Sequence, residues 1–418
     1  MHSDPGFTLK RPWHRRPASK TIAGPPRRHV AHAPARRCLE SAVLSLVALV
    51  LASYLALRLV LPLRCAWPWR VVLAALIYGL ALHHRIVARF AGSMASPELP
   101  KLVIAALGTG FVALLLTALL VLLIDFATLG AWALRRRRPL SALRARGLRP
   151  SAAALALVLS LYGTWQAMVV PKVRQVEIAI ADLPPAFEGY RVLQLTDIHT
   201  SRLLTGDWVA EVVARANAQR PDLIVITGDL VDGSVRARRD DVRPLADLRA
   251  PDGVIAITGN HEYYGQYRAW MDAFAALGMT VLENAHLRIA RGDAALTIAG
   301  VTDPVAERYG MPKPDAAAAL AGADPDAPVI LLDHRPREAR AHAARGVALQ
   351  LSGHTHGGHI IGMDRVIARA NGGFVSGLYP VDGMQLYVSN GAGLWPGFAT
   401  RIGVPSEITL ITLRRAAD

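Results

Sequence analysis

The chain has 418 residues, 52% of them hydrophobic, and a formal net charge of +15, so it is long enough for at least two structural units. The charge is unevenly spread: residues 1–175 carry 24 Lys and Arg against 4 Asp and Glu, whereas residues 176–418 carry 23 against 28. Because the basic excess lies beside apolar segments, it indicates membrane orientation, and no nucleic-acid partner is expected. Cys38 and Cys65 both lie in the first part, which excludes a disulfide framework or a cysteine-based zinc site from the rest.

Residues 1–40 mix Arg, Pro and His without apolar periodicity, which predicts a disordered basic tail. Four apolar stretches follow within residues 41–171. About 20 apolar residues cross a bilayer as a helix, so three of the stretches qualify, while the second has an uninterrupted run of only 12 residues. We therefore expect a transmembrane region of three to four helices. The four stretches are Ala42–Leu63, Trp67–Leu82, Leu102–Leu134 and Ser151–Val170.

The distribution of arginines around the last stretch predicts the orientation. Seven arginines in Arg135–Arg149 precede it, and only Lys172 and Arg174 follow soon after it. The positive-inside rule therefore predicts that residues 172–418 lie on the periplasmic or extracytoplasmic side of a bacterial inner membrane. The basic tail complicates this interpretation, because four full spans would leave one of the two basic segments outside. Alternatively, Arg135–Arg149 merely contacts anionic lipid headgroups.

From about residue 190 the pattern changes to short apolar runs that alternate with helix-like stretches. Two of these stretches, Asp207–Gln219 and Tyr267–Leu277, are amphipathic, and Gly278 stands where a helix would end. Strands that are buried on both faces have continuous apolar runs, so the pattern predicts an α/β domain with a layered sheet core. The predicted strands are Arg191–Leu195, Leu223–Thr227, Val254–Thr258, Leu296–Ala299, Val329–Leu332 and Val347–Leu351.

Polar clusters follow five of the six predicted strands. Open α/β sheets place their ligands at the carboxyl ends of the strands, so we expect the five clusters to meet at one rim. Each cluster alone could be a turn or a surface segment, but five in order are improbable by coincidence. The clusters are Thr196-Asp197-Ile198-His199, Gly228-Asp229-Leu230-Val231-Asp232, Gly259-Asn260-His261-Glu262, Asp333-His334 and Ser352-Gly353-His354-Thr355-His356.

These residue types suit a metal centre. Carboxylates, neutral imidazoles and an amide carbonyl together favour Mn, Fe or Zn. The glycines before Asp229, Asn260 and His354 allow sharp backbone turns. An Asp-x-His pair on an extended backbone would direct Asp197 and His199 to the same side. One shared carboxylate could bridge two ions and so assist an in-line phosphoryl displacement.

Taken together, the five clusters resemble the motif series of calcineurin-like metallophosphoesterases, over about residues 188–415. The segment Ser-Gly-His-Thr-His-Gly-Gly is similar to that of a bacterial membrane-anchored branch with a multi-span N-terminal region. The resemblance implies an α/β (α+β) metallophosphoesterase-type fold, in which a layered β-sandwich is flanked by helices and preceded by an all-α transmembrane region. The three expected parts are the tail at 1–40, the transmembrane region at 41–171 and the metallophosphoesterase domain at 172–418.

The resemblance also implies roles for individual residues. His261 would protonate the leaving oxygen, with Asp232 orienting its imidazole. His359 replaces a glutamine usual in this branch, and would lie behind a ligand or on the substrate side; Asp303 would either line the site or form a turn. Two divalent ions are expected, the first held by Asp197, His199 and His356, the second by Asn260, His334 and His354, with Asp229 bridging.

The implied function is a membrane-anchored two-metal phosphoesterase that hydrolyses phosphodiester, pyrophosphate or phosphomonoester bonds. The anchor favours membrane lipids as partners and lipid-linked or envelope substrates, such as a UDP-diacylglucosamine-like molecule. The alternative is a catalytically degenerate metal-binding domain that signals or acts as a scaffold. A transporter regulated by the hydrolase is a third possibility, although Asp125 is the only acidic residue within the four apolar stretches.

Overall fold

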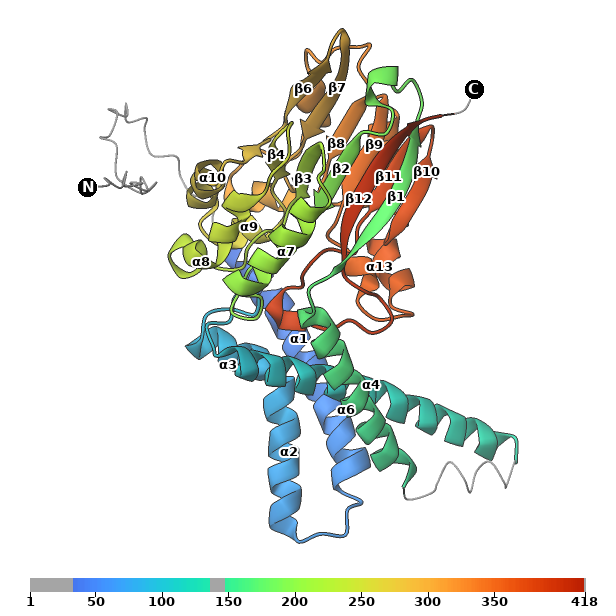
Figure 1. The fold of residues 1–418 in the computed structure, drawn as a ribbon. Coiled ribbons are helices and arrows are strands. Elements are labelled where there is room, and N and C mark those ends of the chain that lie inside the picture. The colour runs from blue at the N-terminus through green and yellow to red at the C-terminus, as the bar shows by residue number, and fades with distance from the viewer. Residues whose placement is uncertain (1–32, 136–146, 417–418) are drawn as a thin grey trace, which may run out of the picture.

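The structure, a computed structural model, consists of a sheet-containing domain resting on a set of long helices (Figure 1). It describes residues 33–135 and 147–416, so residues 1–32 of the expected tail and residues 136–146 of the basic segment lie outside the described residues. Residues 33–40 belong to a helix, so the prediction of disorder is wrong for this part of the tail. The helices of the first part are α1 (Ala33–Leu55, continued by a π turn at Ala56–Val60), α2 (Trp67–Ala81), α3 (His83–Phe90), α4 (Lys101–Ala133) and α6 (Leu148–Met168).

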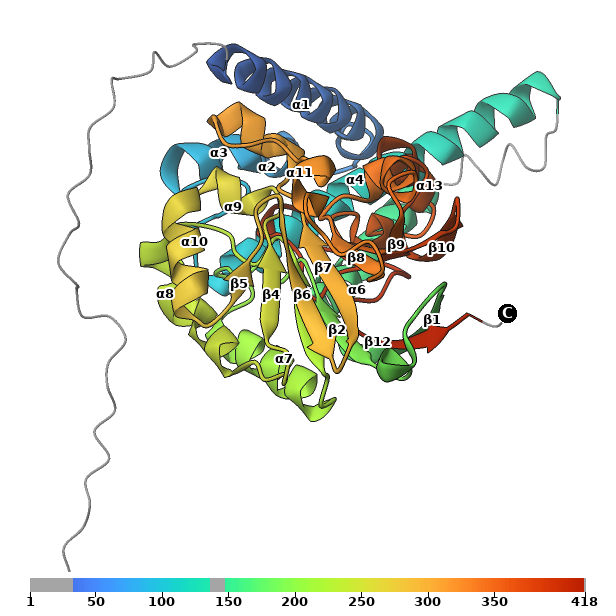
Figure 2. The same ribbon diagram turned by 90° about the horizontal axis from the view of Figure 1, so that it is seen from above.

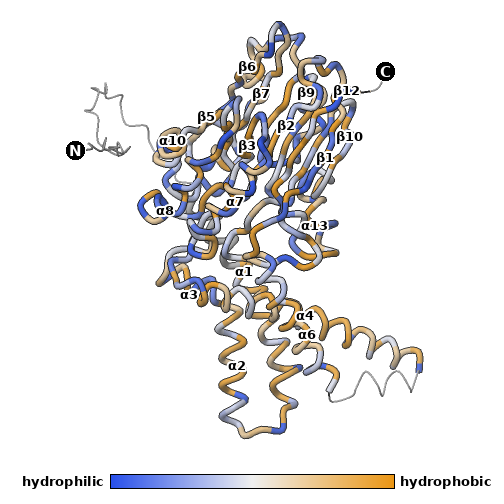
Figure 3. Tube along the Cα trace, viewed as in Figure 1, coloured by the Kyte–Doolittle hydropathy of each residue, from blue (hydrophilic) through white to orange (hydrophobic). Residues whose placement is uncertain are grey.

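Three of these helices are long and apolar enough to cross a membrane: α1 with its π turn, α4 and α6. Helix α2 is short, but α2 and α3 together pass the same test with a bend of 63° between them, giving a possible fourth span. Their surfaces expose leucine, valine and phenylalanine, which water would not favour and lipid would (Figure 3). Exposed tryptophans near the helix ends, at Trp67, Trp132 and Trp165, are typical of residues at a membrane interface.

Helices α1 and α2 form an antiparallel hairpin. Ser45, midway along α1 and near the start of the apolar span Val43–Val60, contacts His84 in α3 at 3.1 Å, whereas Ser53, further along α1, contacts Tyr78 at 2.7 Å. The start of this span therefore lies at the same end of the bundle as α3 and the loop 91–100. The turn between α1 and α2 lies at the opposite end, away from the sheets (Figure 1).

A polar cluster joins three helices away from the sheet-containing domain. Asp125 of α4 accepts hydrogen bonds from Arg58 at 2.5 Å, Arg149 at 2.7 Å and Tyr54 at 2.8 Å. Burial of a charge in an apolar region is costly unless the charge is paired. The pairing explains the lone intramembrane carboxylate as a link between helices, and nothing about it requires a transport pathway.

The second part of the chain is a sandwich of two six-stranded sheets, as expected (Figure 2). Strands β2, β3, β4 and β5 are parallel in one sheet, and β7, β8 and β9 are parallel in the other. In sheet order, the first contains β1 (Lys172–Ile180), β12 (Glu407–Arg415), β2 (Arg191–Leu195), β3 (Leu223–Thr227), β4 (Val254–Ile257) and β5 (Thr280–Val281); the second contains β10 (Gly377–Val381), β11 (Met384–Val388), β9 (Val347–Ser352), β8 (Val329–Leu332), β7 (Ala294–Gly300) and β6 (Ala285–Arg291).

A core of isoleucine, leucine and valine from both sheets fills the space between them, including Val192, Ile298 and Leu351. A second core lies between the first sheet and its helices, and a third lies outside the second sheet. Both faces of each central strand are thus buried, which is why those strands have continuous apolar runs. The flanking helices are α7 (Gly206–Ala218), α8 (Val235–Val242), α9 (His261–Tyr264), α10 (Tyr267–Ala276), α11 (Ala316–Leu320), α12 (Ala339–Ala343) and α13 (Asp364–Ala370).

The sandwich contacts the apolar helices directly. Leu203, Leu394 and Ala399 of the sandwich form one buried cluster with Ile104 of α4 and Ala167 of α6. The backbone N–H of Arg401 donates to the carbonyl of Gly163 within α6 at 2.9 Å. The loops that follow the central strands are at this end of the sandwich, so the edge expected to carry the site faces the membrane helices (Figure 1).

Candidate metal centre

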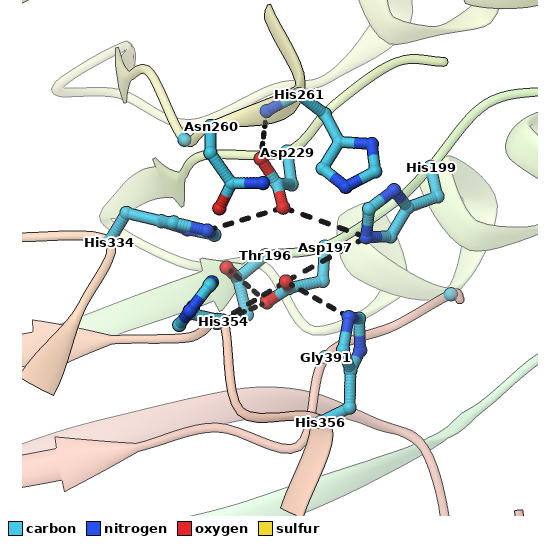
Figure 4. A network of polar contacts seen from close by, with 12 residues as sticks. Thr196, Asp197, His199, Asp229, Asn260, His261, His334, His354, His356 and Gly391 are labelled. Carbon is cyan, nitrogen blue, oxygen red and sulfur yellow. Dashed lines mark hydrogen bonds and ion pairs between the residues drawn. The ribbon is translucent and has the colours of Figure 1, made fainter. Parts of the chain in front are cut away.

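The five polar clusters meet at one edge of the sandwich, where β2, β3, β4, β8 and β9 end (Figure 4). Two groups of three side chains have potential ligand atoms within 4.8 Å of one another and could each hold a metal ion. The first group is Asp197, His199 and His356, and the second is Asp229, His334 and His354. A further group of the same kind joins His199, Asp229 and His261.

Asp229 lies between the two groups. Its Oδ2 is 3.2 Å from His334 Nε2 on one side and 3.7 Å from His199 Nε2 on the other. Its Oδ1 accepts a hydrogen bond from the His261 backbone N–H at 2.8 Å, which fixes the carboxylate plane. This is the placement that a bridging carboxylate would need.

The backbone of the site is strained. Asp197 and His199 have φ of 51° and 49°, a left-handed conformation that non-glycine residues rarely adopt. The prediction that an extended Asp-x-His backbone directs both side chains inward is therefore wrong, although both side chains do converge on the cluster. Asp229, His354 and His356 share the same conformation, with φ of 53°, 69° and 49°.

Two glycines are required for space rather than for conformational freedom. A Cβ at Gly259 would lie 2.2 Å from Asp229 Oδ1, and a Cβ at Gly353 would lie 2.3 Å from Asp197 Oδ2. Neither glycine has a positive φ; of the three preceding glycines singled out in the sequence, only Gly228 does, at 94°. The motif glycines thus let the loops approach the carboxylates closely.

Two imidazoles are oriented by hydrogen bonds on the side away from the cluster. His334 Nδ1 is 2.8 Å from the Thr227 carbonyl, which can only accept, so Nδ1 carries a proton and Nε2 is the ring nitrogen that faces the cluster. His199 Nδ1 likewise faces Asp232 Oδ2 at 3.1 Å. Nε2 of each ring is buried and has no hydrogen-bond partner among the described residues. A carboxylate or carbonyl behind a histidine is the usual arrangement around a metal, so these residues fit a divalent ion.

Electrostatics favours the neutral form of two histidines of the site, His354 and His356. Burial, reinforced by the charge of His334, holds the pKa of His354 well below its ordinary value. Burial and the neighbouring His359 do the same to the pKa of His356. A neutral imidazole is the form that binds metal, so neither residue needs to lose a proton when an ion binds near neutral pH.

Two histidines of the site, His334 and His261, are held in the charged form. At His334 the carboxylates of Asp229 and Asp197 outweigh burial and raise the pKa of the imidazole to about 10. His261 is the second case. Burial alone would lower its pKa, but the carboxylates of Asp232 and Asp229 outweigh burial and raise the pKa of His261 to about 9. Its Nδ1 makes a short hydrogen bond with Asp232 Oδ1. Despite its own burial, Asp232 has a lowered pKa because it faces the imidazoles of His261 and His199. The structure thus joins the two residues expected to form the acid and its orienting carboxylate.

Glu262 is a buried residue of the site to which the sequence suggested no role. Its carboxylate accepts hydrogen bonds from the backbone N–H groups of Asp229 at 3.1 Å, Leu230 at 2.7 Å and Gly259 at 2.8 Å. It therefore ties the loops after β3 and β4 together behind Asp229. Its place directly after the Gly-Asn-His run is the signal that could have indicated this role.

Arg335 is a second residue of the site to which the sequence suggested no role. Its guanidinium binds both oxygens of Asp303, at 2.6 and 3.1 Å, and donates to Asn260 Oδ1 at 3.1 Å. Asp303 also caps the following turn by accepting from the Val305 N–H at 2.7 Å, so it both forms a turn and lines the site. Asn260 Nδ2 lies 3.2 Å from the hydroxyl of Tyr264, an exposed ring beside His261. The side chain of Arg335 is 28% exposed, which leaves a cation at the rim.

His359 lies behind His356 and does not face the two groups. Its ring packs against His356 at 4.9 Å between centroids and against Phe398 at 5.3 Å. Burial and the nearby Arg401 lower the pKa of His359 to about 3, so it is neutral. Of the two expectations for this residue, the geometry favours a position behind a ligand.

Comparison with known proteins places this site in a family. The family model for calcineurin-like phosphoesterases matches residues 190–358, which include all five clusters. A "Transmembrane protein with metallophosphoesterase domain" from Danio rerio is 30% identical over 383 residues, covering 82% of this chain and 87% of that protein. An uncharacterized metallophosphoesterase from Aquifex aeolicus is 31% identical, covering 62% of this chain and 98% of its own length.

An uncharacterized metallophosphoesterase from Helicobacter pylori (strain J99 / ATCC 700824) is 32% identical over 253 residues, covering 60% of this chain and 66% of that protein. Vertebrate and bacterial relatives thus occur side by side, and the similarity does not assign the chain to a bacterial branch. Among solved structures, phosphopantetheinyl hydrolase from Mycobacterium tuberculosis matches 51% of this chain and 96% of its own, with 15% identity and a TM-score of 0.33, too low to inform on activity. The motif series, the site and the full-length relatives together show that the chain is a membrane protein of the calcineurin-like phosphoesterase family.

Proposed function

We propose that this protein is a membrane-anchored phosphoesterase that uses two divalent metal ions, of Mn, Fe or Zn type. The observation that carries the proposal is that Asp229, a member of the second three-residue group, lies 3.7 Å from His199 of the first group and 3.2 Å from His334 of its own. The first ion would be held by Asp197, His199 and His356. The second would be held by Asn260, His334 and His354, and Asp229 would be shared.

The chain's own residues supply the rest of the chemistry. Bound ions in such a pair polarise a phosphoryl group and lower the pKa of water, so that a nucleophile is available at neutral pH. His261, charged and held by Asp232, would donate its proton to the departing oxygen. Arg335 would bind a phosphoryl oxygen at the rim, since a guanidinium presents paired N–H groups to phosphate.

The surroundings of the site favour a phosphorylated lipid or a lipid-linked pyrophosphate as the substrate. The indole ring of Trp395 is 6.2 Å from the imidazole ring of His261 between centroids. Trp395 directly precedes the turn Pro396–Phe398, which packs against α4. A substrate headgroup held at the end of the membrane helices would thus be near the acid. The fold and the metal ligands do not by themselves determine the substrate, so the proposal of a lipid substrate rests on the position of the site next to the membrane helices.

The segment that contains Ile361 and helix α13 exposes apolar side chains together with Arg365 and Arg369. Ile361 and Val366 expose 73% and 63% of their surface. The N–H of Ile361 bonds to the carbonyl of Ile402, whose side chain lies against Gly163 of α6. Figure 1 shows α13 at the end of the sandwich that faces α4 and α6, and we propose that the exposed apolar side chains of this segment contact lipid.

An assay of the full-length protein in lipid nanodiscs tests the proposal. Hydrolysis of bis-p-nitrophenyl phosphate should require Mn²⁺ and should stop with a chelator. A diacyl phosphate ester in the same nanodiscs should be hydrolysed with a kcat/KM higher than that of the water-soluble ester with the same headgroup. Metal binding without turnover would support a scaffold instead, and equal rates for both esters would remove the lipid part of the proposal.

We further propose that the site lies on the extracytoplasmic side, since Arg135–Arg149 would remain in the cytoplasm by the positive-inside rule. If α2 and α3 together cross the membrane as one bent span, the chain crosses it four times. The start of α1, and with it the basic tail, would then be on the same side as the catalytic site. Reporter fusions after Ala66 and Leu134 should then be cytoplasmic, and fusions after Ala95 and Ile180 extracytoplasmic. A cytoplasmic reporter after Ile180 would overturn the orientation.

Replacing Arg335 by lysine should lower kcat/KM by roughly tenfold to a hundredfold, because a charge-assisted hydrogen bond contributes about 1.5–3 kcal/mol. Lysine keeps the charge but cannot bind Asp303 through two nitrogens and Asn260 through a third contact. Steady-state kinetics with bis-p-nitrophenyl phosphate measures the effect. Arg337→Lys is the matched control, since that side chain is 68% exposed and pairs only loosely with Glu338, at 3.8 Å. Equal kinetics for the two variants would exclude Arg335 from substrate binding.

A further inference from the structure

The loop between α3 and α4 connects the membrane helices to two loops of the metal centre. Glu98 on this loop accepts a hydrogen bond from Arg202 Nε at 3.0 Å and a second, short one from Arg238 Nη2. Arg202 lies in the loop after β2, just beyond His199, and Arg238 lies in α8, just beyond Asp232. Glu98 therefore joins the segments that follow two of the site's strands.

The side chain of Arg238 is completely buried, so its charge cannot be solvated by water. A buried guanidinium needs an anionic partner. Its Nη2 binds Glu98, and the other nearby carboxylate, that of Asp241, is 3.7 Å from Nη1. Its Nε donates to the backbone carbonyl of Asp232 at 3.1 Å. Without Glu98 the guanidinium would turn toward Asp241 or water and leave that carbonyl.

The same carbonyl can accept a second hydrogen bond directly from the loop. Ser96 Oγ is 3.3 Å from the Asp232 carbonyl and also 3.3 Å from Glu98 Oε1, so its single proton is donated to one of these two acceptors at a time. The same Oγ is 2.7 Å from where a Cβ of Gly233 would be. The peptide of Asp232 is thus contacted by one donor from the loop and by another that Glu98 holds in place. Both act on the backbone, and the carboxylate is left for the site.

The carboxylate of Asp232 contacts two functional imidazoles. Oδ1 accepts from His261 Nδ1, and Oδ2 is 3.1 Å from His199 Nδ1. A displacement of the Asp232 peptide would therefore move the acid His261 away from the leaving oxygen. Misplacement of a reacting group by about 1 Å can cost about a hundredfold in rate.

We propose that Glu98, within the membrane half of the chain, is a positioning residue for catalysis, which acts through Arg238 and the Asp232 peptide on His261. The inference rests on the proposed phosphoesterase function. The membrane half then does more than anchor the enzyme, because its loop 91–100 completes the support of the acid. The alternative is that Glu98 has only a structural role and holds the sandwich against the helices. In that case it would contact the same residues, but its effect would not depend on His261.

A double-mutant test with full-length protein separates these two roles. Glu98→Gln should lower kcat roughly tenfold for an alkyl phosphate ester, with KM unchanged. In a His261→Ala background the same substitution should change kcat less than about twofold, because residues that act as one unit are not additive. An equal loss in both backgrounds, or none in either, would overturn the proposal.

The chain offers a matched control and a milder variant. Glu188 also pairs with an arginine, Arg414, at 3.2 Å and is 42% exposed, compared with 35% for Glu98. It follows the turn Pro185–Phe187 and precedes β2, so it lies before the strand whose carboxyl end carries the metal centre. Glu188→Gln should leave the kinetics unchanged. Ser96→Ala keeps every charge in place and should reproduce the Glu98 pattern at about two- to threefold. If Glu98→Gln folds poorly, the kinetics of Ser96→Ala test the proposal instead.

Hydrogen exchange provides a readout that does not depend on activity. In Glu98→Gln, peptides covering residues 228–238 should take up deuterium faster than in the wild type or in Glu188→Gln, because the loop loses its outer support. Unchanged uptake there would overturn the proposal even if activity fell. If the wild type had no phosphoesterase activity, the proposed function would fail, while faster exchange would still show the support of the Asp232 loop by Glu98.

Discussion

Asp229→Asn is expected to lower kcat/KM by at least about three orders of magnitude, the largest effect of any single substitution in this protein. The shared carboxylate would contact both ions, and metal stabilisation of a phosphoryl transition state is worth several kcal/mol, with each 1.4 kcal/mol a factor of ten. Asparagine preserves the shape but removes the charge that lies between His199 and His334. Metal content after dialysis, measured by mass spectrometry, should fall together with activity.

A matched control for this substitution is available on α8. Asp240→Asn makes the same change on a side chain that is 92% exposed. It should leave both activity and metal content unaltered. If Asp229→Asn retained a substantial part of the wild-type rate, the two-metal assignment would be wrong, because the groups on either side would then function without a shared ligand.

His261→Ala is expected to lower kcat by about 10²–10⁴-fold for an alkyl ester, the usual range for loss of a general acid. The loss should be much smaller for a p-nitrophenyl ester, because nitrophenolate leaves without protonation. Metal content should remain near the wild-type value, since His261 is assigned to the leaving group rather than to an ion. A loss of equal size for both esters would contradict the acid role, and a loss of metal would make His261 a ligand.

The pH dependence gives a second test of the same residue. The folded-state pKa of His261 is raised to about 9, so the imidazole is charged at neutral pH and loses its proton as pH rises through that value. The wild-type kcat should therefore decline on the alkaline side for an alkyl ester. Asp232→Asn removes the carboxylate that raises this pKa most, so the decline should move to lower pH. An unmoved alkaline limb would assign it to another group.

The parts of the fold that the sequence predicts are those that depend on neighbours in the chain. Strands β2, β3 and β8 have the predicted bounds, because each is predominantly apolar and ends at a polar cluster. Gly278 follows α10 with φ of 90°, as its position after the apolar periodicity suggested. The polar clusters converge because parallel strands end at a common edge.

The rest depends on contacts between distant residues, which a local pattern does not contain. The pairing of β1 with β12 joins residues more than 200 positions apart, and neither strand was predicted. Arg335 and Glu98 resemble any surface charge in the sequence, and only the fold places one beside Asp303 and the other beside Arg238. The bend between α2 and α3 likewise follows from packing, since no proline marks it.

The bond between Arg401 and Gly163 has a consequence for protein engineering. Arg401 is anchored to α6 by its backbone, while its buried guanidinium donates to the carbonyl of His356 at 3.2 Å and to that of Asn390 at 2.6 Å. The last membrane helix and a metal-binding loop are thus joined through one residue. Each residue inserted into a helix turns everything beyond it by about 100°. The catalytic domain therefore cannot be fused to an arbitrary transmembrane helix. A chimera must keep the number of residues, and hence the helical phase, between Gly163 and Lys172.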